Sequence, residues 1–453
     1  MCLWDEMNYD QAVHYLLTLG RELAAPTQAA AAKFDLENIA VLAERLGRPD
    51  RAYPSAHIAG TNGKGSTAAF LESILRHAGF RTGLYTSPHL ERINERIRIN
   101  GEELGDEPFA AMFTRLQGLI EELLAAHKLR AHPTYFECLT AMAFECFARD
   151  RVEFGVFEVG LGGRLDATNI LSPLVTIITR IDFDHENFLG HSLKEIAAEK
   201  AGILKPAVPL IAAPQPPQAR EVILARANQV GSPVIETPQA FQIKEESSQN
   251  GFFRARVREI SSGEPFEIAP SLPGRFQLQN ALNAFAAARQ LAVRGFRISS
   301  KDITEGVATT VWPGRLEKLQ SNPDVYLDGA HNPGAARELA QFLEQRFAGR
   351  KIWLIYGALR DKAVDEIAGQ LFPHATEVIF TGPRTSRAIS AARLAEIASH
   401  HAPSFTVISS AEQALDQTLA EAAPDDAVFI TGSLYLVGQV RRYWKQREQV
   451  AAR

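Results

Sequence analysis

Residues 60–66 read GTNGKGS, and their types and spacing are suited to binding a phosphate group. The ordinary phosphate loop, G-x-x-x-x-G-K-[ST], needs a hydroxyl residue directly after the lysine, whereas here Gly65 separates Lys64 from Ser66. We expect a buried strand before this stretch and an amphipathic helix after it. Glycines allow close backbone approach, and amides at a helix start attract anions. We therefore interpret the stretch as a nucleotide phosphate loop, the alternative being a plain turn with Ser66 as helix cap.

Three further motifs follow predicted strands or lie on a predicted helix. Glu158 ends an apolar strand and precedes GLGG, but Leu165 stands where a dinucleotide-binding G-x-G-x-x-G pattern needs glycine. Asp184 and His185 follow another apolar strand, and Lys200 lies on a predicted helix. A carboxylate and an imidazole at this edge could hold Mg²⁺, although Mg²⁺ prefers oxygen ligands and an ammonium group repels it. A hydrogen-bonded loop histidine and a surface or salt-bridged lysine remain open alternatives.

The composition is that of a globular protein with more than one domain. The chain has 453 residues, 46% of them hydrophobic and 22% charged, and this length exceeds what one hydrophobic core usually supports. Its 48 basic and 53 acidic residues give a net charge of −5, which does not favour nucleic acid or an anionic membrane. The amino terminus lacks a signal-peptide pattern, so we expect a cytoplasmic protein without nucleic-acid or membrane partners.

The order of predicted elements places the motifs at one sheet edge. From AHIAG to VPLIAA, apolar strands alternate with helices, which predicts a mostly parallel α/β sheet covered on both faces. Residues 240–270 resemble an antiparallel ribbon, and the Pro-Gly pair of WPGRLE marks a boundary before a second alternating region. We expect a phosphate-loop α/β domain over 1–311, a linker over 312–317 and a smaller Rossmann-like α/β domain over 318–453.

With these motifs assembled, the chain resembles the folylpolyglutamate synthase and dihydrofolate synthase family, a branch of the Mur ligase superfamily. The resemblance runs essentially end to end and rests on HIAGTNGKGS, YTSPHL, TYFE, EVGLGGRLDATN, DHENFLG, EKAGILK, NALNAFAA, WPGRLE, DGAHNP, GALRDK and TGSLYLVG, in the family's order. It implies that G-T-x-G-K-G-[ST] is this superfamily's own phosphate loop and that the first domain is of the Mur ligase central-domain type. One departure is Phe276, where relatives commonly have histidine before Gln277, and we assign no polar role there.

The resemblance also implies site residues. ATP is expected at the loop, the linker and the second domain, through Gly60, Thr61, Asn62, Gly63, Lys64, Gly65, Ser66, Asn280, Arg315, Asp328 and His331. Magnesium, expected as two ions, is assigned to Ser87, Glu158, His185 and Lys200, and a monovalent cation is considered as a further cofactor. In relatives the lysine of EKAGI is carbamylated, so Lys200 would carry a carboxylate-like group. The pteroate or folate is expected at Thr134, Tyr135, Phe136, Glu137, Leu165, Asp166 and Ala167.

Such an enzyme joins a carboxylate to an amine through an acyl phosphate made with ATP. We therefore expect a monomeric, ADP-forming ligase that adds L-glutamate to dihydropteroate, to reduced folates or to both, with TYFE and LDATN favouring the bifunctional case. Its catalytic residues would be Lys64, Glu158, His185 and Lys200. Arg387 and Ser433 are candidates for holding glutamate, with a helix-end or surface position as the alternative for each.

Two other functions share parts of this pattern. A muropeptide ligase performs the same chemistry on a UDP-linked acceptor, but TYFE and YTSPHL suit the folate branch. A nucleotide-regulated switch would also bind a triphosphate, but no guanine-reading N-K-x-D string occurs, and a switch needs no second domain that contributes Arg315 and Asp328.

Overall fold

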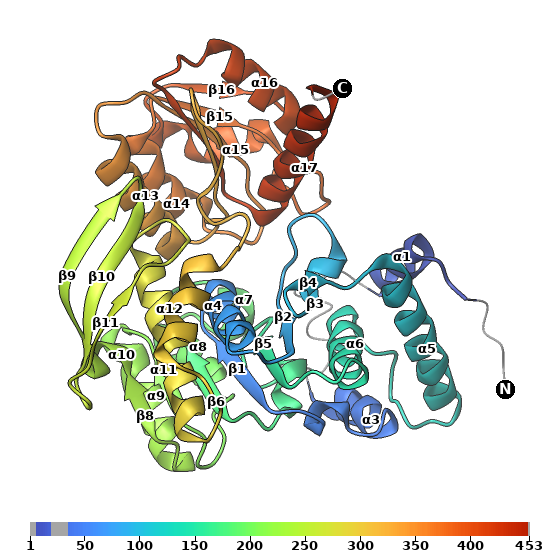
Figure 1. Ribbon diagram of the computed structural model, residues 1–453. Coiled ribbons are helices and arrows are strands. Elements are labelled where there is room, and N and C mark those ends of the chain that lie inside the picture. Colours follow the sequence, from blue (N-terminus) through green and yellow to red (C-terminus); the bar gives the residue numbers. More distant parts are fainter. Residues whose placement is uncertain (1–5, 20–34, 452–453) are drawn as a thin grey trace.

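The computed structural model describes residues 6–19 and 35–451, which form two α/β units, each built on its own sheet (Figure 1). The larger sheet belongs to the amino-terminal part of the chain and the smaller one to the carboxy-terminal part. Within these ranges, two α-helices precede the first strand of the larger sheet, α1 (Tyr9–Thr18) and α3 (Glu37–Arg45).

Within the described chain, the larger sheet has eight strands in the order β4-β3-β2-β5-β1-β6-β7-β8. All neighbouring pairs from β2 to β8 in this order are parallel, which confirms the predicted parallel sheet, while β3 and β4 add an antiparallel edge. The strands are β1 (Ser55–Ala59), β2 (Thr82–Tyr85), β3 (Ile97–Ile99), β4 (Glu102–Glu103), β5 (Phe154–Glu158), β6 (Val175–Ile178), β7 (Leu210–Ala212) and β8 (Val234–Glu236).

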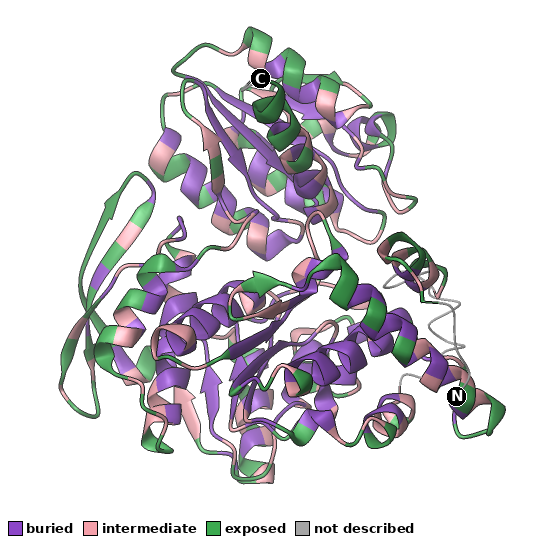
Figure 2. Ribbon diagram, turned by 45° about the vertical axis from the view of Figure 1, so that its right-hand side comes forward, coloured by how far each residue is buried: buried purple, intermediate pink, exposed green. Residues whose placement is uncertain are grey.

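Helices cover both faces of this sheet, so its central strands are buried throughout (Figure 2). Side chains alternate along each strand, and Ile58 and Val156 therefore pack on one face while Tyr85 and Phe157 pack on the other. The first face is covered by α4 (Lys64–His77), α11 (Phe276–Val293) and α12 (Ser300–Thr309), and the second by α1, α3, α5 (Asp106–Ala125) and α6 (Tyr135–Arg149). A further core lies under α7 (Glu186–Leu189), α8 (Leu193–Ala201) and α9 (Pro217–Val230).

The predicted antiparallel ribbon is present and contacts both units. It follows α10 (Thr237–Ala240) and consists of β9 (Phe241–Gln249), β10 (Phe252–Glu259) and β11 (Pro265–Ile268). Phe266 stacks on Phe285 of α11 with ring centroids 4.0 Å apart, which fixes the ribbon to the first unit. At its tip, Asn250 Oδ1 accepts a hydrogen bond from Arg346 of the second unit at 3.3 Å.

The smaller sheet has the strand order β12-β13-β17-β14-β15-β16 in the described chain. Its strands are β12 (Glu317–Gln320), β13 (Asp324–Leu327), β14 (Ile352–Tyr356), β15 (Glu377–Phe380), β16 (Phe405–Val407) and β17 (Ala427–Thr431). One face packs under α13 (Pro333–Phe347), α14 (Val364–Leu371) and α15 (Ala391–Ala398), and the other under α16 (Ala411–Glu421) and α17 (Leu434–Ala451). Strands and helices alternate along this region, as predicted. The antiparallel β12 was not predicted, because its polar sequence EKLQ carries no apolar alternation.

The carboxyl ends of strands in both sheets turn toward the junction of the two units. Loops that follow β1 and β6 meet loops that follow β13 and β14, and side chains of these loops are joined by hydrogen bonds. Open α/β sheets bind ligands at this edge, so the fold places the predicted motifs where a shared site can form. In the described part of the chain, no helix is long and apolar enough to cross a membrane.

Candidate active site

The phosphate loop joins β1 to α4 and depends on two glycines. Gly60 has a φ of +147° and Gly63 a φ of +90°, which are conformations that other residues rarely adopt. A Cβ on Gly60 would lie 1.9 Å from Thr179 Oγ1, and one on Gly63 would lie 2.2 Å from Asn280 Oδ1. The sequence therefore needs glycine here both for backbone conformation and for the close approach of two neighbouring elements.

The amide groups of the loop fall into two sets. The amides of Thr61 and Asn62 both donate to Arg180 O, at 3.0 and 3.1 Å, so they tie the loop to its neighbour and do not point at a ligand. By contrast, α4 begins at Lys64 and no side chain caps it, which leaves its first amides without an intrahelical acceptor. The alternative, a plain turn with Ser66 as helix cap, is wrong, since Ser66 is the third residue of this helix. The free helix start is an anion site.

Lys64 carries the positive charge of the loop and lies beside Glu158 at the end of β5. Its Nζ is 4.0 Å from Glu158 Oε1 and donates to Thr61 O at 3.2 Å. The other carboxylate oxygen of Glu158 accepts a hydrogen bond from Ser87 N at 3.2 Å. Burial raises the pKa of the Glu158 carboxyl, and the ammonium group of Lys64 opposes that rise. Three of the predicted site residues are thus brought together.

Lys200 lies beneath the same loop. It is 5% exposed, and its Nζ donates to Gly60 O at 2.8 Å. The surface or salt-bridged position that the spacing left open is wrong, because within the described residues no carboxylate lies within ion-pair distance of this ammonium group. Burial, and next the positive charge of Lys64, lowers the pKa of Lys200 to about 7. In a substantial fraction of the molecules, the Lys200 side chain is therefore a neutral amine at physiological pH.

His185 presents an unpaired ring nitrogen to the site. Its backbone is left-handed, with a φ of 52°, and its amide donates to Asp184 Oδ1 at 2.9 Å. His185 Nδ1 is buried and has no hydrogen-bond partner in the described part of the chain. Burial lowers the pKa of His185 to about 3, against the opposing charge of Asp184, so the ring is neutral. A neutral imidazole with an orphaned nitrogen favours a ligand role over a hydrogen-bonded loop histidine.

The donor set fits a magnesium ion bound jointly with phosphate oxygens. Glu158 supplies a buried carboxylate, Ser87 lies directly beside it, and His185 supplies the free nitrogen. In this region of the described chain, no three carboxylate, imidazole or thiol ligand atoms lie within 4.8 Å of one another, so the protein does not form a closed cage. Mg²⁺ is usually bound by one or two carboxylates together with waters and substrate phosphates, which agrees with this open arrangement.

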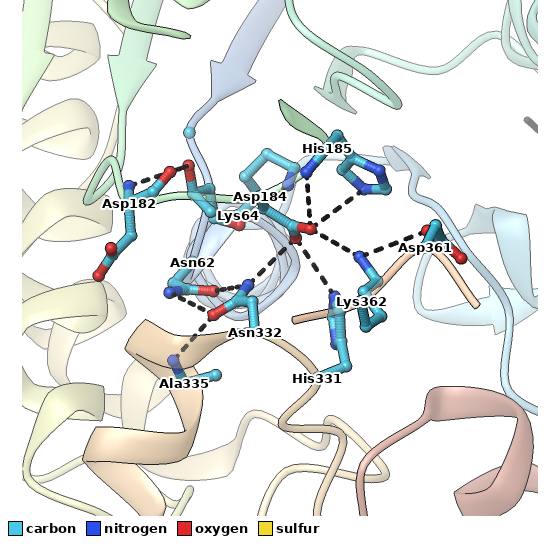
Figure 3. Close-up of polar contacts among 12 residues, drawn as sticks. Asn62, Lys64, Asp182, Asp184, His185, His331, Asn332, Ala335, Asp361 and Lys362 are labelled. Carbon is cyan, nitrogen blue, oxygen red and sulfur yellow. Dashed lines mark hydrogen bonds and ion pairs between the residues drawn. The ribbon is translucent and has the colours of Figure 1, made fainter. Parts of the chain in front are cut away.

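Side chains of the second unit converge on Asp184 from the opposite direction (Figure 3). Asp184 accepts hydrogen bonds from Lys362 Nζ at 2.6 Å and from Asn332 Nδ2 at 3.1 Å, and His331 Nε2 lies 3.6 Å from it. Burial alone would raise the pKa of Asp184, but Lys362, His331 and His185 together hold it well below its usual range. His331 was expected here. Asn332 and Lys362 were missed, although the motifs DGAHNP and GALRDK contain them.

An asparagine pair joins the phosphate loop to the second unit. Asn62 Nδ2 donates to Asn332 Oδ1 at 3.2 Å, and Asn332 Nδ2 donates back to Asn62 Oδ1 at 2.9 Å. Asn332 also caps α13 by accepting from Ala335 N at 2.9 Å. Thr61 is held from within the first unit, since its hydroxyl donates to Asp182 O at 3.0 Å. The side chains of Thr61 and Asn62 therefore position the loop.

The other expected nucleotide residues come from α11, the linker and the end of β13. Asn280 Nδ2 donates to Gln277 Oε1 at 2.9 Å, and Gln277 in turn donates to Ser66 Oγ at 3.4 Å, which places both beside the loop. Asp328 accepts hydrogen bonds only from backbone amides in the described chain, at 2.9 and 3.0 Å. Burial raises its pKa, and the guanidinium group of Arg315 opposes the rise. Gln277 was missed because a buried polar helix residue has no signature in the sequence.

The two expected pteroate segments meet, but several of their side chains are engaged in local structure. Thr134 and Glu137 form a capping box at the start of α6, with hydrogen bonds of 2.8 and 3.2 Å. Asp166 accepts hydrogen bonds from Gly160 N at 2.9 Å and from Leu161 N at 3.0 Å. Phe136 packs directly under Gly160, where a Cβ would lie 2.5 Å from its ring. The remaining members are Tyr135 and Ala167, which are buried, and Leu165, which is half-buried.

The two glutamate candidates lie on the second unit in different surroundings. Arg387 Nη2 donates to Asp361 Oδ1 at 2.8 Å, and Asp361 precedes Lys362, so Arg387 stands one residue behind the cluster around Asp184. Ser433 is 2% exposed, and its hydroxyl accepts a hydrogen bond from Tyr435 N at 3.2 Å at the start of α17. Ser433 thus lies at a helix end, as its alternative stated. Arg387 forms an ion pair with Asp361.

Comparison with known proteins places the chain in a family. Residues 58–288 match the Mur ligase middle domain, and residues 314–434 match the Mur ligase glutamate ligase domain. The chain is 36% identical over 416 residues to the dihydrofolate synthase/folylpolyglutamate synthase of Bacillus subtilis (strain 168), covering 89% of this chain and 93% of that protein. The chain belongs to the folylpolyglutamate and dihydrofolate synthase branch of the Mur ligase family. Like its relatives, it is a ligase.

Solved structures of this family resemble the chain over nearly its whole length. Mycobacterium tuberculosis folylpolyglutamate synthase complexed with ADP has a TM-score of 0.88 at 32% identity, covering 96% of this chain and 98% of its own. Escherichia coli FolC in complex with DHPP and ADP has a TM-score of 0.83 at 29% identity, covering 98% and 99%. These likenesses confirm the predicted family and its two-unit α/β fold.

The pKa of Lys200 predicts how stability changes with pH. Between about pH 7 and the ordinary lysine pKa of 10.5, the unfolded chain keeps this proton and the folded chain has lost it. The unfolded state then binds more protons, so the free energy of unfolding rises with pH by about 1.4 kcal/mol per unit from this group. We expect Lys200→Met to lack this rise, as measured by urea unfolding near pH 7 and near pH 10 in buffers freed of CO₂.

The control for that experiment is Lys301→Met, because the side chain of Lys301 is 77% exposed. Its unfolding free energy should follow the wild type at both pH values. A difference between wild type and Lys200→Met that does not grow with pH would show that Lys200 keeps an ordinary pKa.

Proposed function

We propose that this ligase uses ATP to join L-glutamate to the carboxylate of dihydropteroate, of a reduced folate, or of both. The observation that carries the proposal is the uncapped start of α4, which begins at Lys64, on a loop that the Asn62–Asn332 pair joins to the second unit. This arrangement is suited to a polyphosphate held between the two units. The relatives support it: the Bacillus subtilis protein is named for both activities, and the Escherichia coli structure holds DHPP and ADP.

The acceptor carboxylate is a poor electrophile, so the reaction requires that it first be activated. Transfer of the terminal phosphoryl group of ATP to the acceptor carboxylate gives an acyl phosphate, whose carbonyl carbon the amine of glutamate attacks with loss of phosphate. Negative charge gathers on the phosphoryl group in the first step. Lys64 and the first amides of α4 are positioned to stabilise that charge without reorganisation, which is worth about 3–4 kcal/mol for a well-placed donor. Glu158 holds the lysine toward the site by its charge.

We assign magnesium to Ser87, Glu158, His185 and modified Lys200, in agreement with the free ring nitrogen and the buried carboxylate. When bound, Mg²⁺ polarises phosphoryl oxygens as a Lewis acid. Two ions and a monovalent cation, expected from the resemblance, stay predictions.

Lys200 is proposed to be carbamylated. Only a neutral amine reacts with CO₂, and the pKa of about 7 gives Lys200 such a fraction at physiological pH. We expect Lys200→Ala to lose most activity and to regain part of it with added short carboxylic acids, which can replace the missing carboxylate. Lys205→Ala serves as the control, since Lys205 is a partly buried lysine that donates to Asn169 O at 2.8 Å, outside the loop. An unmodified amine on Lys200 in a well-resolved experimental density map would exclude the carbamate.

The substrate assignments follow the same segments. We propose that the pteroate ring binds near Phe136, Leu165 and Ala167, where the two folate motifs meet at Gly160. We propose that glutamate binds on the second unit near Arg387. Residues 312–317 are proposed to act as the linker between domains 1–311 and 318–453, about which the units close and exclude water from the acyl phosphate. The monomeric state stays a prediction.

The direct test is turnover with purified protein. Incubation with ATP, dihydropteroate and L-glutamate should give sustained, multiple-turnover release of ADP only when all three are present. Repeating it with tetrahydrofolate in place of dihydropteroate separates the two synthase activities. A rate of ADP release that does not depend on the folate acceptor, or nucleotide binding without turnover, would contradict the proposal.

Lys64→Ala is expected to reduce kcat by about 10²-fold or more while the protein stays folded, because the side chain faces a ligand and not a core. Steady-state kinetics and circular dichroism check the two parts of this statement. Lys351→Ala is a matched control, since Lys351 lies over the Trp353 ring, away from the loop. Wild-type turnover in Lys64→Ala would show that the charge of the phosphate loop does not contribute to catalysis.

A further inference from the structure

A row of alternating charges runs from the first unit into the second. Asp184 of the first unit accepts a hydrogen bond from Lys362 Nζ at 2.6 Å, and Asp361 Oδ2 lies 3.9 Å from the same nitrogen. The other oxygen of Asp361 accepts a hydrogen bond from Arg387 at 2.8 Å. Figure 3 shows Lys362 between the two carboxylates, with His331 and Asn332 on the same side of Asp184. Lys362 is thus held at the junction by carboxylates of both units.

Lys362 has more hydrogen-bond donors than the protein uses. An ammonium group has three N–H donors, and in the described chain Asp184 Oδ1 is the one acceptor within hydrogen-bond distance of Lys362 Nζ. The side chain is only 6% exposed, so water satisfies the remaining donors poorly. A buried cation with unused donors is costly unless a ligand completes its contacts. The missing partner is therefore an acceptor that enters the junction.

The chemistry of Lys362 favours an anion as that partner. The unused N–H donors of an ammonium group form their strongest hydrogen bonds with charged acceptors. Lys64 of the phosphate loop is a second cation of the site and lies beside Glu158, while Asp184 and Asp361 lie beside Lys362. An anion between the two units would accept hydrogen bonds from Lys362 and be attracted by both cations.

The position of Lys362 points to the outermost phosphate. The loop and the start of α4 lie on the first unit, and the Asn62–Asn332 pair brings the second unit directly against that loop. Asn332 donates to Asp184, the same carboxylate that holds Lys362. A triphosphate seated on the loop therefore extends its end toward Lys362. Arg387 lies behind Asp361 and supports Lys362 indirectly.

We propose that Lys362 is a catalytic residue that binds the transferring phosphoryl group from the side of the second unit. The inference rests on the proposed ligase function. In the step concerned, the bond between the terminal phosphorus and the bridging oxygen breaks with its electron pair on ADP, and an oxygen of the acceptor carboxylate forms the new bond to phosphorus. Lys362 keeps its proton and donates hydrogen bonds to the phosphoryl oxygens throughout.

The test compares nucleotides that differ only in the terminal phosphate. We expect Lys362→Met to weaken binding of the β,γ-methylene analogue of ATP by about tenfold or more, the loss typical of a charged hydrogen bond, while ADP binding changes little. Isothermal titration calorimetry with the full chain, in Mg²⁺ and again with a chelator, measures both constants. Lys362→Arg, which keeps the charge, should recover part of the difference, and Lys351→Met should bind both nucleotides as the wild type does.

Three outcomes would overturn the inference. Equal weakening of both nucleotides would place Lys362 outside the terminal phosphate site. A raised KM for glutamate, with unchanged nucleotide binding and unchanged kcat, would assign Lys362 to the amino acid carboxylate. Wild-type behaviour of Lys362→Met would make it a structural ion pair. Should Lys362→Met not fold, Lys362→Gln gives the same comparison. Wild-type turnover, measured in parallel, tests the proposed function separately, since a failed ligase assay leaves the nucleotide comparison valid.

Discussion

The structure depends on holding several amines close together in a largely buried junction. Lys64, Lys200 and Lys362 come from α4, α8 and the loop after β14, and no single element could bring them together. Like charges in a buried place repel, and the fold opposes this with Glu158 and Asp184 and by lowering the pKa of Lys200. Each amine has one fixed acceptor in the protein, and the arrangement is complementary to a polyanion.

The same residues join the two units and surround the site. Asp184, Asn332 and Asn62 form continuous hydrogen bonds across the junction, so the approach of the second unit and the completion of the site are one structural event. An enzyme that makes a water-sensitive acyl phosphate benefits from this coupling, since its second set of cations arrives together with the walls that exclude solvent.

The sequence predicted most of the fold, and it predicted those parts of the site that lie within one continuous motif. Apolar strands that alternate with helices predicted both sheets, and GTNGKGS before a helix predicted the phosphate loop. It did not predict β12, whose polar residues form a strand only because β13 pairs with them. Spacing alone left a surface or salt-bridged position open for Lys200, since nothing local shows that a lysine is buried under a loop 140 residues away. Lys362 and Asn332 are informative only once the two sheets face each other. The T-x-x-E capping box of Thr134 and Glu137 was visible in the sequence and was overlooked.

Amide hydrogen exchange with and without the β,γ-methylene analogue of ATP tests the central claim most directly. The account predicts slower exchange in the phosphate loop at 60–67 together with slower exchange in the second-unit segments 328–335 and 357–363, because one anion contacts both sides of the junction. Protection confined to the phosphate loop, with the second-unit segments unchanged, would contradict it.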